Sequence, residues 1–390
     1  MSIIKPFRAL RPAIDKAKQV SCMPYDVAAE SEARVFIHEN PESFLRVTRP
    51  EAEFQPPEHP SAQSVLARAE HNLRQMIEHG SLIEDPEPAF YIYRLATDEH
   101  SQTGVVACCS LEEYENGLIK RHETTRPDKV ADRTNHMLAL KAQTGLIFLA
   151  YRGTAEVARI IDEATAGEPL YHFTCAAGIE HTVWRVAADS GLAEAFADVP
   201  ALYIADGHHR IESAQQARRA LADSTGDMSG EAEFDFVLAG IYPAEELRIL
   251  PYNRVVHDLN GLGPDEFLAR IAEDFDVDGT DQAMPAAHGE ICMYLDGKWR
   301  RLRFKGEESR GLGPIEHLDV SILQNYILAP ILGIEDPRTD TRIEFVGGAR
   351  GVDVSSGIES APGRKDPALI RAFIDAARKA VARQPERTHP

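Results

Sequence analysis

The stretch ALYIADGHHRIES spans Ala201 to Ser213 and decides the fold class of this chain. The apolar residues Ala201 to Ala205 predict a compact buried strand, which ends at Asp206 and Gly207. From Arg210 to Ala222 the alanine-rich RIESAQQARRALA predicts a helix, because alanine and arginine have high intrinsic helix propensity. A strand, a tight turn and a helix in direct succession are a building unit of α/β proteins.

Strand and helix patterns alternate through the rest of the chain without a fixed repeat length. We expect strands at 146–151 and 234–241, strand hairpins at 89–110 and 289–304, and helices at 61–80 and 154–167. The acidic segment 81–88 is predicted to be a turn-rich linker. Neither GxGxxG nor GxxxxGK[ST] follows any strand, which argues against a standard dinucleotide fold and a P-loop. The predicted fold class is mixed α/β (α+β), with one large mixed sheet.

The composition is that of a folded protein with an acidic surface. Forty-two Lys and Arg residues stand against 62 Asp and Glu, for a formal net charge of -20 in 390 residues. Such a field repels phosphate polymers and anionic membranes, so we expect neither nucleic acid nor membrane as a partner. No stretch approaches the roughly 20 apolar residues of a membrane span, and the five cysteines form no CxxC pair. These features predict a cytoplasmic protein that can still bind a small anion at a local basic cluster.

The turn DGHHR joins groups that suit a phosphate-bearing ligand. Gly207 permits a tight turn, and the helix that follows offers backbone N–H groups near His208, His209 and Arg210. The helix N-terminus is partly positive, and Arg210 can bind phosphate oxygens through its fork of donors. Asp206 is a candidate general base or Mg²⁺ ligand, and the two histidines are candidate proton donors or acceptors. The alternative is structural: Asp206 caps the helix and the histidines pack locally.

A second constellation, IKRHETTRPDKVADR from Ile119 to Arg133, is basic against the trend of the chain. We expect a polar loop here, followed by a helix with Pro127 in its first turn. Our hypothesis is that the stretch closes over a phosphate from the side opposite DGHHR, with Glu123 or Asp128 as a carboxylate for proton transfer or metal binding. The alternative is a solvated helix face with ordinary ion pairs. The candidate ligand-binding residues of this stretch are Lys120, Arg121, His122 and Arg133.

A third stretch, NPESFLRVTRPE from Asn40 to Glu51, contains Ser43, Arg46 and Arg49 as candidate contacts to a carboxylate or phosphate. The alternative is a capped loop with surface arginines. We do not expect a structural zinc, because His208 and His209 are adjacent in sequence and no cysteine pairs with them.

Six stretches together resemble one family. PYDV, NPESFLRV, YENGLIKRHETTRPDKVADR, LIFLAYRG, YIADGHHRIESA and DVSILQNYILAPILGI look like the bacterial and archaeal domain-of-unknown-function family 1015. The resemblance runs from Pro6 to about Gly357, and the family has no settled activity. It implies a domain at 1–357, built either as one body or as two interlocked lobes at about 1–200 and 201–357. Residues 358–390 depart from the family pattern and form a divergent tail, in which 367–383 are predicted to be helical.

A shorter resemblance adds chemistry. DGHHR is similar to the motif of the ParB/sulfiredoxin superfamily, particularly its free serine kinases. The resemblance implies that Asp206 assists an acceptor hydroxyl while His208, His209 and Arg210 hold phosphate oxygens. It also implies ATP or ADP with Mg²⁺ as the cofactors.

These observations predict a phosphate-binding or nucleotide-binding protein. The leading hypothesis is a phosphotransferase that acts on a small hydroxylated metabolite such as serine, because phosphoryl transfer mainly requires positioning and charge neutralisation. A phosphomonoesterase would use the same residues. A non-catalytic nucleotide-binding regulator is the alternative from a different class.

Overall fold

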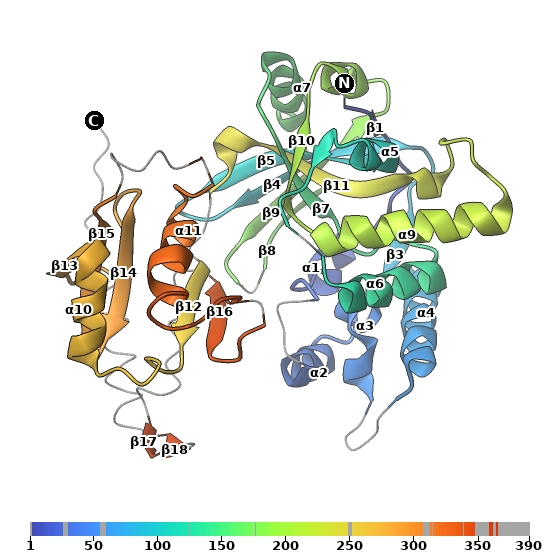
Figure 1. Ribbon diagram of the computed structural model, residues 1–390. Coiled ribbons are helices and arrows are strands. Elements are labelled where there is room, and N and C mark those ends of the chain that lie inside the picture. Colours follow the sequence, from blue (N-terminus) through green and yellow to red (C-terminus); the bar gives the residue numbers. More distant parts are fainter. Residues whose placement is uncertain are drawn as a thin grey trace. The chain divides into compact units, whose positions relative to one another are not determined.

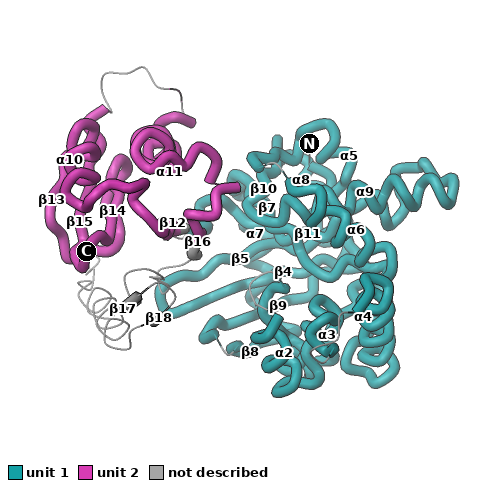
Figure 2. Tube along the Cα trace, turned by 60° about the horizontal axis from the view of Figure 1, so that its bottom comes forward, with its two compact units in different colours: residues 1–248 teal, residues 249–390 magenta. Residues whose placement is uncertain are grey.

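The computed structural model of the chain divides into two compact units, residues 1–248 and 249–390 (Figure 2). The predicted lobe boundary near residue 200 falls inside the first unit, and the helix predicted at 367–383 lies outside the described residues. The structure describes residues 2–25, 30–54, 60–123, 125–175, 177–248, 252–306, 313, 315–337, 339–347, 359–361 and 364–365.

Unit 1 is built on a mixed sheet of nine strands (Figure 1). Eight of them follow the order β6-β10-β7-β11-β5-β4-β9-β8, and β1 pairs with β5 beside this path. β10 runs parallel to β6 and antiparallel to β7, which confirms the predicted mixed sheet. The strands are β1 (Ile4–Lys5), β4 (Ala89–Ala96), β5 (Ser101–Ser110), β6 (Ile119–Lys120), β7 (Ile147–Tyr151), β8 (Tyr171–Thr174), β9 (Glu180–Ala187), β10 (Leu202–Asp206) and β11 (Phe236–Pro243).

Helices pack around this sheet, and a small separate sheet joins β2 to β3. The bounds are β2 (Leu10–Pro12), α1 (Ala17–Val20), α2 (Glu30–Glu39), α3 (Leu45–Thr48), α4 (Ala62–Glu78), β3 (Leu82–Glu84), α5 (Leu111–Glu115), α6 (Pro127–Leu140), α7 (Ala155–Thr165), α8 (Leu192–Ala197) and α9 (His208–Thr225).

The main core lies on one face of the sheet. Alternate residues of β7, namely Ile147, Leu149 and Tyr151, are buried there, as period-2 patterning requires. Helices α7, α8 and α9 cover this face with apolar side chains, including Ile160, Phe196 and Ile211. Burial of each large apolar side chain stabilises the fold by roughly 1.5–3 kcal/mol.

The predicted strand-turn-helix unit is confirmed to within a few residues. β10 ends at Asp206, Gly207 forms the turn in the left-handed region at φ 97°, and α9 begins at His208. The helix ends at Gly226, which also has a left-handed conformation (φ 73°). Figure 1 shows α9 beside α6, and the two helices pack against each other. The fold therefore sets the two sequence motifs on neighbouring elements.

The described residues of unit 2 form three small sheets and two α-helices. One sheet has the order β13-β15-β14, and its hairpin turns at Asp296 and Gly297, as predicted. The predicted helix near Pro330 is short: α11 leads into a π-helical turn at Gln324–Leu328, and turns follow. The bounds are β12 (Tyr252–Val256), α10 (Pro264–Asp274), β13 (Phe275–Gly279), β14 (Glu290–Leu295), β15 (Lys298–Phe304), α11 (Asp319–Leu323), β16 (Ile343–Gly347), β17 (Glu359–Ala361) and β18 (Arg364–Lys365).

Within the described residues, every helix is too short or too polar to cross a lipid bilayer.

Candidate functional site

The candidate site lies at one edge of the large sheet, where β6 and β10 end side by side. The two strands are parallel neighbours, with Leu202 opposite Ile119 and Tyr203 opposite Lys120. Their carboxyl ends therefore meet at the same edge, and each leads to the N-terminus of a helix, α6 after β6 and α9 after β10. In sheets that contain parallel strands, ligands often bind at such an edge, where helix N-termini offer partial positive charge.

Two hydrogen bonds join the loop after β6 to the start of α9. The backbone N–H of His122 donates to Nε2 of His208 at 3.5 Å, and the backbone N–H of Arg126 donates to Nε2 of His209 at 3.1 Å. The rings of His122 and His208 also meet edge to face, with their centroids 4.5 Å apart. The stretch from Ile119 to Arg133 and the turn DGHHR are thus in direct contact.

The contacts assign both histidines a positioning task. A ring nitrogen that accepts an N–H bond carries no proton, so Nε2 is unprotonated in both rings. His208 is buried, with 4% of its side chain exposed, and its Nδ1 lies 3.5 Å from Oε2 of Glu123. Burial, followed by the nearby His122, lowers the pKa of His208, although Glu123 and Asp206 oppose the shift. A neutral His208 can therefore hold the loop.

Asp206, the last residue of β10, and Arg210, in the first turn of α9, form an ion pair. Nη2 of Arg210 donates to Oδ2 of Asp206, while Nη1 donates to the backbone carbonyl of Leu146, the residue before β7. The Asp206 carboxylate is 65% exposed, so an incoming ligand can reach it. The structural alternative for Asp206 fails, because Gly207 is the N-cap of α9 and no side chain caps that helix.

Gly207 is required by the backbone at this turn. A Cβ atom at this position would lie 3.2 Å from Cα of Ile147 on the neighbouring strand, in addition to the left-handed strain. Because Gly207 has no side chain, the backbone at the end of β10 can lie close to Ile147 of β7.

The basic residues of the second stretch divide into two groups. Lys120 and Arg121 are exposed at the end of β6, and the nearby hydroxyl of Tyr114 donates to Glu212 at 2.9 Å. Arg126 and Asp128 form an ordinary exposed ion pair, as the alternative of a solvated helix face predicts. The stretch thus serves both as a partner of DGHHR and as a helix surface.

The third stretch has partners of its own. Ser43 is fully buried, and its hydroxyl accepts the N–H of Leu45. Arg46 donates to Glu53 at 2.6 Å, to the Pro41 carbonyl and to Asn72. These contacts indicate a structural task for both residues and leave them outside the contacts that join the two motifs.

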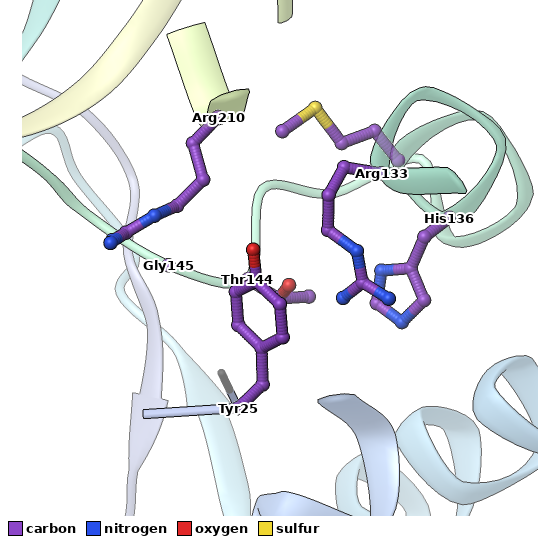
Figure 3. A pocket seen from close by; sticks show the side chains of 7 residues that line it. Tyr25, Arg133, His136, Thr144, Gly145 and Arg210 are labelled. Carbon is purple, nitrogen blue, oxygen red and sulfur yellow. The ribbon is translucent and has the colours of Figure 1, made fainter. Parts of the chain in front are cut away.

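A small pocket, here called the Arg133 pocket, adjoins the turn (Figure 3). Its cavity volume is about 20 Å³, and Arg210 lines both this pocket and the turn. Sequence reasoning singled out Arg133 and Arg210 but missed Thr144, for which a Thr-Gly pair before a buried strand is the only local signal. The lining residues are Tyr25, Arg133, His136, Met137, Thr144, Gly145 and Arg210.

Two exposed carboxylates, those of Asp206 and Glu123, lie near the turn. In the described part of the chain, no cluster of three or more His, Cys, Asp or Glu side chains is arranged to hold a metal ion. Mg²⁺ in nucleotide sites is often held by only one or two carboxylates together with the phosphates and water. Asp206 and Glu123 are exposed carboxylates on the two motifs, and both act on the charge of His208.

Comparison with known families gives two matches along the chain. The family model described as "Protein of unknown function (DUF1015)" matches residues 4–321. A second model, described as N-(5'phosphoribosyl)anthranilate (PRA) isomerase, matches residues 320–376. The second match covers most of the stretch whose sequence departs from the family 1015 pattern. The candidate site lies wholly within the first match.

Curated relatives align with short parts of this chain only. The N-(5'-phosphoribosyl)anthranilate isomerase of Rhodopseudomonas palustris (strain BisA53) is 80% identical over 60 residues, which are 15% of this chain and 26% of that enzyme. The enzyme of strain BisB5 is 76% identical over 33 residues, 8% of this chain and 15% of that enzyme. The chain thus spans about a quarter or less of these relatives. No solved structure matches the chain.

Proposed function

We propose, from the premise that this chain belongs to the DUF1015 family of proteins of unknown function, that it binds a phosphate-bearing ligand at the Asp206–Arg210 turn and transfers a phosphoryl group. The observation that carries the proposal is the junction of the two motifs through His208 and His209. It brings the N-termini of two helices and the basic end of β6 to one sheet edge in an acidic protein. Such an arrangement favours an anion.

The proposed reaction moves a phosphoryl group from a nucleotide to a small hydroxylated metabolite such as serine. The acceptor hydroxyl oxygen forms a bond to the terminal phosphorus, and the bond from that phosphorus to the bridging oxygen breaks. The hydroxyl proton passes to the Asp206 carboxylate, and the nucleotide leaves with one phosphate fewer. Arg210 and Lys120 neutralise phosphate charge, which is the main demand of phosphoryl transfer.

ATP or ADP with Mg²⁺ is the proposed cofactor set. Bound Mg²⁺ would neutralise phosphate charge, and Glu123 would hold it while Asp206 acts as the base. The resemblance of DGHHR to the motif of free serine kinases also supports this choice.

The alternatives remain a phosphomonoesterase with the same residues and a regulator without turnover. One observation favours the regulator: Arg210 is already paired with Asp206, and Nε2 of each histidine already accepts a backbone N–H. A site engaged in this way can bind an anion without supplying a proton acceptor.

One experiment separates the three candidates. The full chain is incubated with Mg²⁺, ATP or ADP and a panel of small hydroxyl compounds, and ³¹P NMR follows the products, while calorimetry measures nucleotide binding. We expect Asp206→Asn to lower turnover by roughly 100-fold or more, the lower end of general-base contributions, and to keep nucleotide affinity within about twofold. Asp223→Asn, on the exposed last turns of α9, is the matched control.

The outcomes have distinct meanings. Unchanged turnover in Asp206→Asn overturns the role of that residue. Nucleotide binding without any product supports the regulator, and hydrolysis of phosphomonoesters without transfer supports the esterase. No binding of ATP, ADP or inorganic phosphate by the wild-type chain overturns the proposal itself.

A further inference from the structure

The Arg133 pocket lies against the proposed phosphate site and has a charge of its own. Its lining residues include Arg133 and Arg210, and neither Asp nor Glu is among them. This is notable in a chain with a net charge of -20. The pocket therefore favours an anionic group over a cation.

His136 adds no positive charge to the pocket. Its Nε2 lies 2.9 Å from the backbone carbonyl of Val47, and a carbonyl only accepts, so the ring proton sits on Nε2. Burial lowers the pKa of His136, which keeps the ring neutral. In the neutral ring, Nδ1 is an acceptor that suits an ammonium or hydroxyl donor beside the anion.

Arg133 is held in place before any ligand binds. Its side chain is only 16% exposed, and its guanidinium carbon lies 4.4 Å from the ring centroid of Tyr25. Figure 3 shows the side chain reaching from α6 toward Tyr25, with Thr144 beside that ring. Nε and Nη2 both donate to Oδ2 of Asp132, at 3.0 and 2.6 Å. A guanidinium fixed on several sides loses little conformational entropy when it binds an anion.

We propose that the Arg133 pocket binds the carboxylate of the phosphoryl acceptor, which makes the acceptor a small hydroxy acid or hydroxy amino acid. The inference rests on the proposed function, because it takes the phosphate to lie at the Asp206–Arg210 turn. Arg210 belongs both to the Asp206–Arg210 turn and to the lining of the Arg133 pocket. An acceptor molecule whose hydroxyl lies near Asp206 can therefore place its carboxylate beside Arg133. A planar carboxylate matches the donor fork of arginine and the small volume of the pocket.

The test uses pairs of probes that differ only in the carboxylate. L-Serine is compared with ethanolamine, and glycerate with ethylene glycol, by calorimetry on the full chain. We expect the carboxylate-bearing member of at least one pair to bind 10-fold or more tightly than its partner. Arg133→Gln should remove that preference, while ADP affinity stays within about twofold.

Two further variants guard against a simple folding defect. Because Arg133 packs on Tyr25, its loss can disturb the fold, so Thr144→Val provides a milder change in the same pocket and should weaken the carboxylate probe several-fold. Arg159→Gln removes a surface arginine on α7, which pairs with Glu156 and Glu163, and should change neither probe. Thermal unfolding checks that each variant is folded.

The outcomes distinguish this inference from the proposed function. Equal binding of both members in both pairs, or an unchanged preference in folded Arg133→Gln and Thr144→Val, overturns the inference. Loss of ADP affinity instead of serine or glycerate affinity also overturns it, because the pocket would then hold a phosphate. If ADP and inorganic phosphate fail to bind while the carboxylate preference depends on Arg133, the pocket stands and the proposed function fails.

Discussion

Nε2 of His208 accepts the backbone N–H of His122, and this bond ties the loop after β6 to the first turn of α9. The bond exists only while Nε2 carries no proton. His209 makes the same kind of bond to Arg126, so two adjacent histidines hold one loop through two backbone donors. The assembly of the site is therefore coupled to the protonation of these rings.

The first prediction is a loss of stability on acidification. Because the folded pKa of His208 lies below its ordinary value of 6.5, the unfolded chain binds a proton first as the pH falls. The contribution of the neutral ring is fully present above about pH 6.5 and is lost as the pH falls through the lower folded pKa. Urea unfolding between pH 7.5 and pH 5 measures this slope.

The control for that prediction is His208→Gln, whose side-chain oxygen can accept the same N–H and does not titrate. Burial also lowers the pKa values of His136 and His181, so the wild-type slope has several contributors, and only its difference from the variant reports His208. The variant should show a shallower slope. An identical slope in both proteins would contradict the role given to His208.

The second prediction concerns Gly207→Ala. The left-handed backbone costs an alanine about 1–2 kcal/mol, and the Cβ contact with Ile147 adds an overpacking cost of about 1–3 kcal/mol. Gly226→Ala is the matched control, because Gly226 is also left-handed but has open space around it. The free energy of unfolding should fall clearly more in Gly207→Ala, and an equal loss in the two variants would show that the contact does not matter.

The sequence sufficed for the strand-turn-helix unit because each of its parts has a local cause. Apolar continuity indicates β10, an Asp-Gly pair indicates the turn, and alanine-rich sequence indicates α9. The partner strand β6 could not be predicted in this way. It has only two residues, Ile119 and Lys120, which is too short for any periodicity, and it exists because β10 offers it a parallel edge.

The burial of Asp85 could not be predicted from the local sequence either. It lies in the segment 81–88, which was predicted to be a turn-rich linker on account of its acidic and proline residues. In the structure its carboxylate is 2% exposed and receives bonds from Arg11, Arg185 and Tyr91. Arg11 and Arg185 lie 74 and 100 residues away in sequence, so no local pattern reveals these two partners.

The third prediction follows from that buried carboxylate. Asp85→Asn leaves two guanidinium groups without their shared counter-ion and should cost about 3 kcal/mol, the lower end for a broken buried pair, because Arg185 is partly exposed. Glu84→Gln is the control: its pair with Arg8 is exposed on both sides and should be worth less than about 1 kcal/mol. Chemical unfolding at pH 7 compares the two variants, and a smaller loss in Asp85→Asn would refute the assignment.

Protonation of Asp85 also lowers the stability of the fold at low pH. Burial raises the pKa of its carboxyl, but bonds from Tyr91 and Arg11 outweigh burial and hold the pKa below its ordinary value of 3.8. Its stabilising contribution is therefore present above about pH 4 and is lost as the pH falls through the lower folded pKa. This window lies well below that of His208, so the two groups can be separated in one titration of stability.

The last prediction separates ligand binding from stability within the basic groups. Lys120→Ala and Arg210→Ala should each weaken the binding of ADP or inorganic phosphate by about 1.5–3 kcal/mol, the worth of a hydrogen bond to a charged group. Only Arg210→Ala should also destabilise the fold, because it removes the donor to the Leu146 carbonyl, at a cost of about 1–3 kcal/mol. Lys129→Ala, on the exposed side of α6, is the control. Calorimetry and urea unfolding give the two quantities. If Lys120→Ala binds phosphate like the wild type, the end of β6 does not face the ligand, and the site is confined to the turn itself.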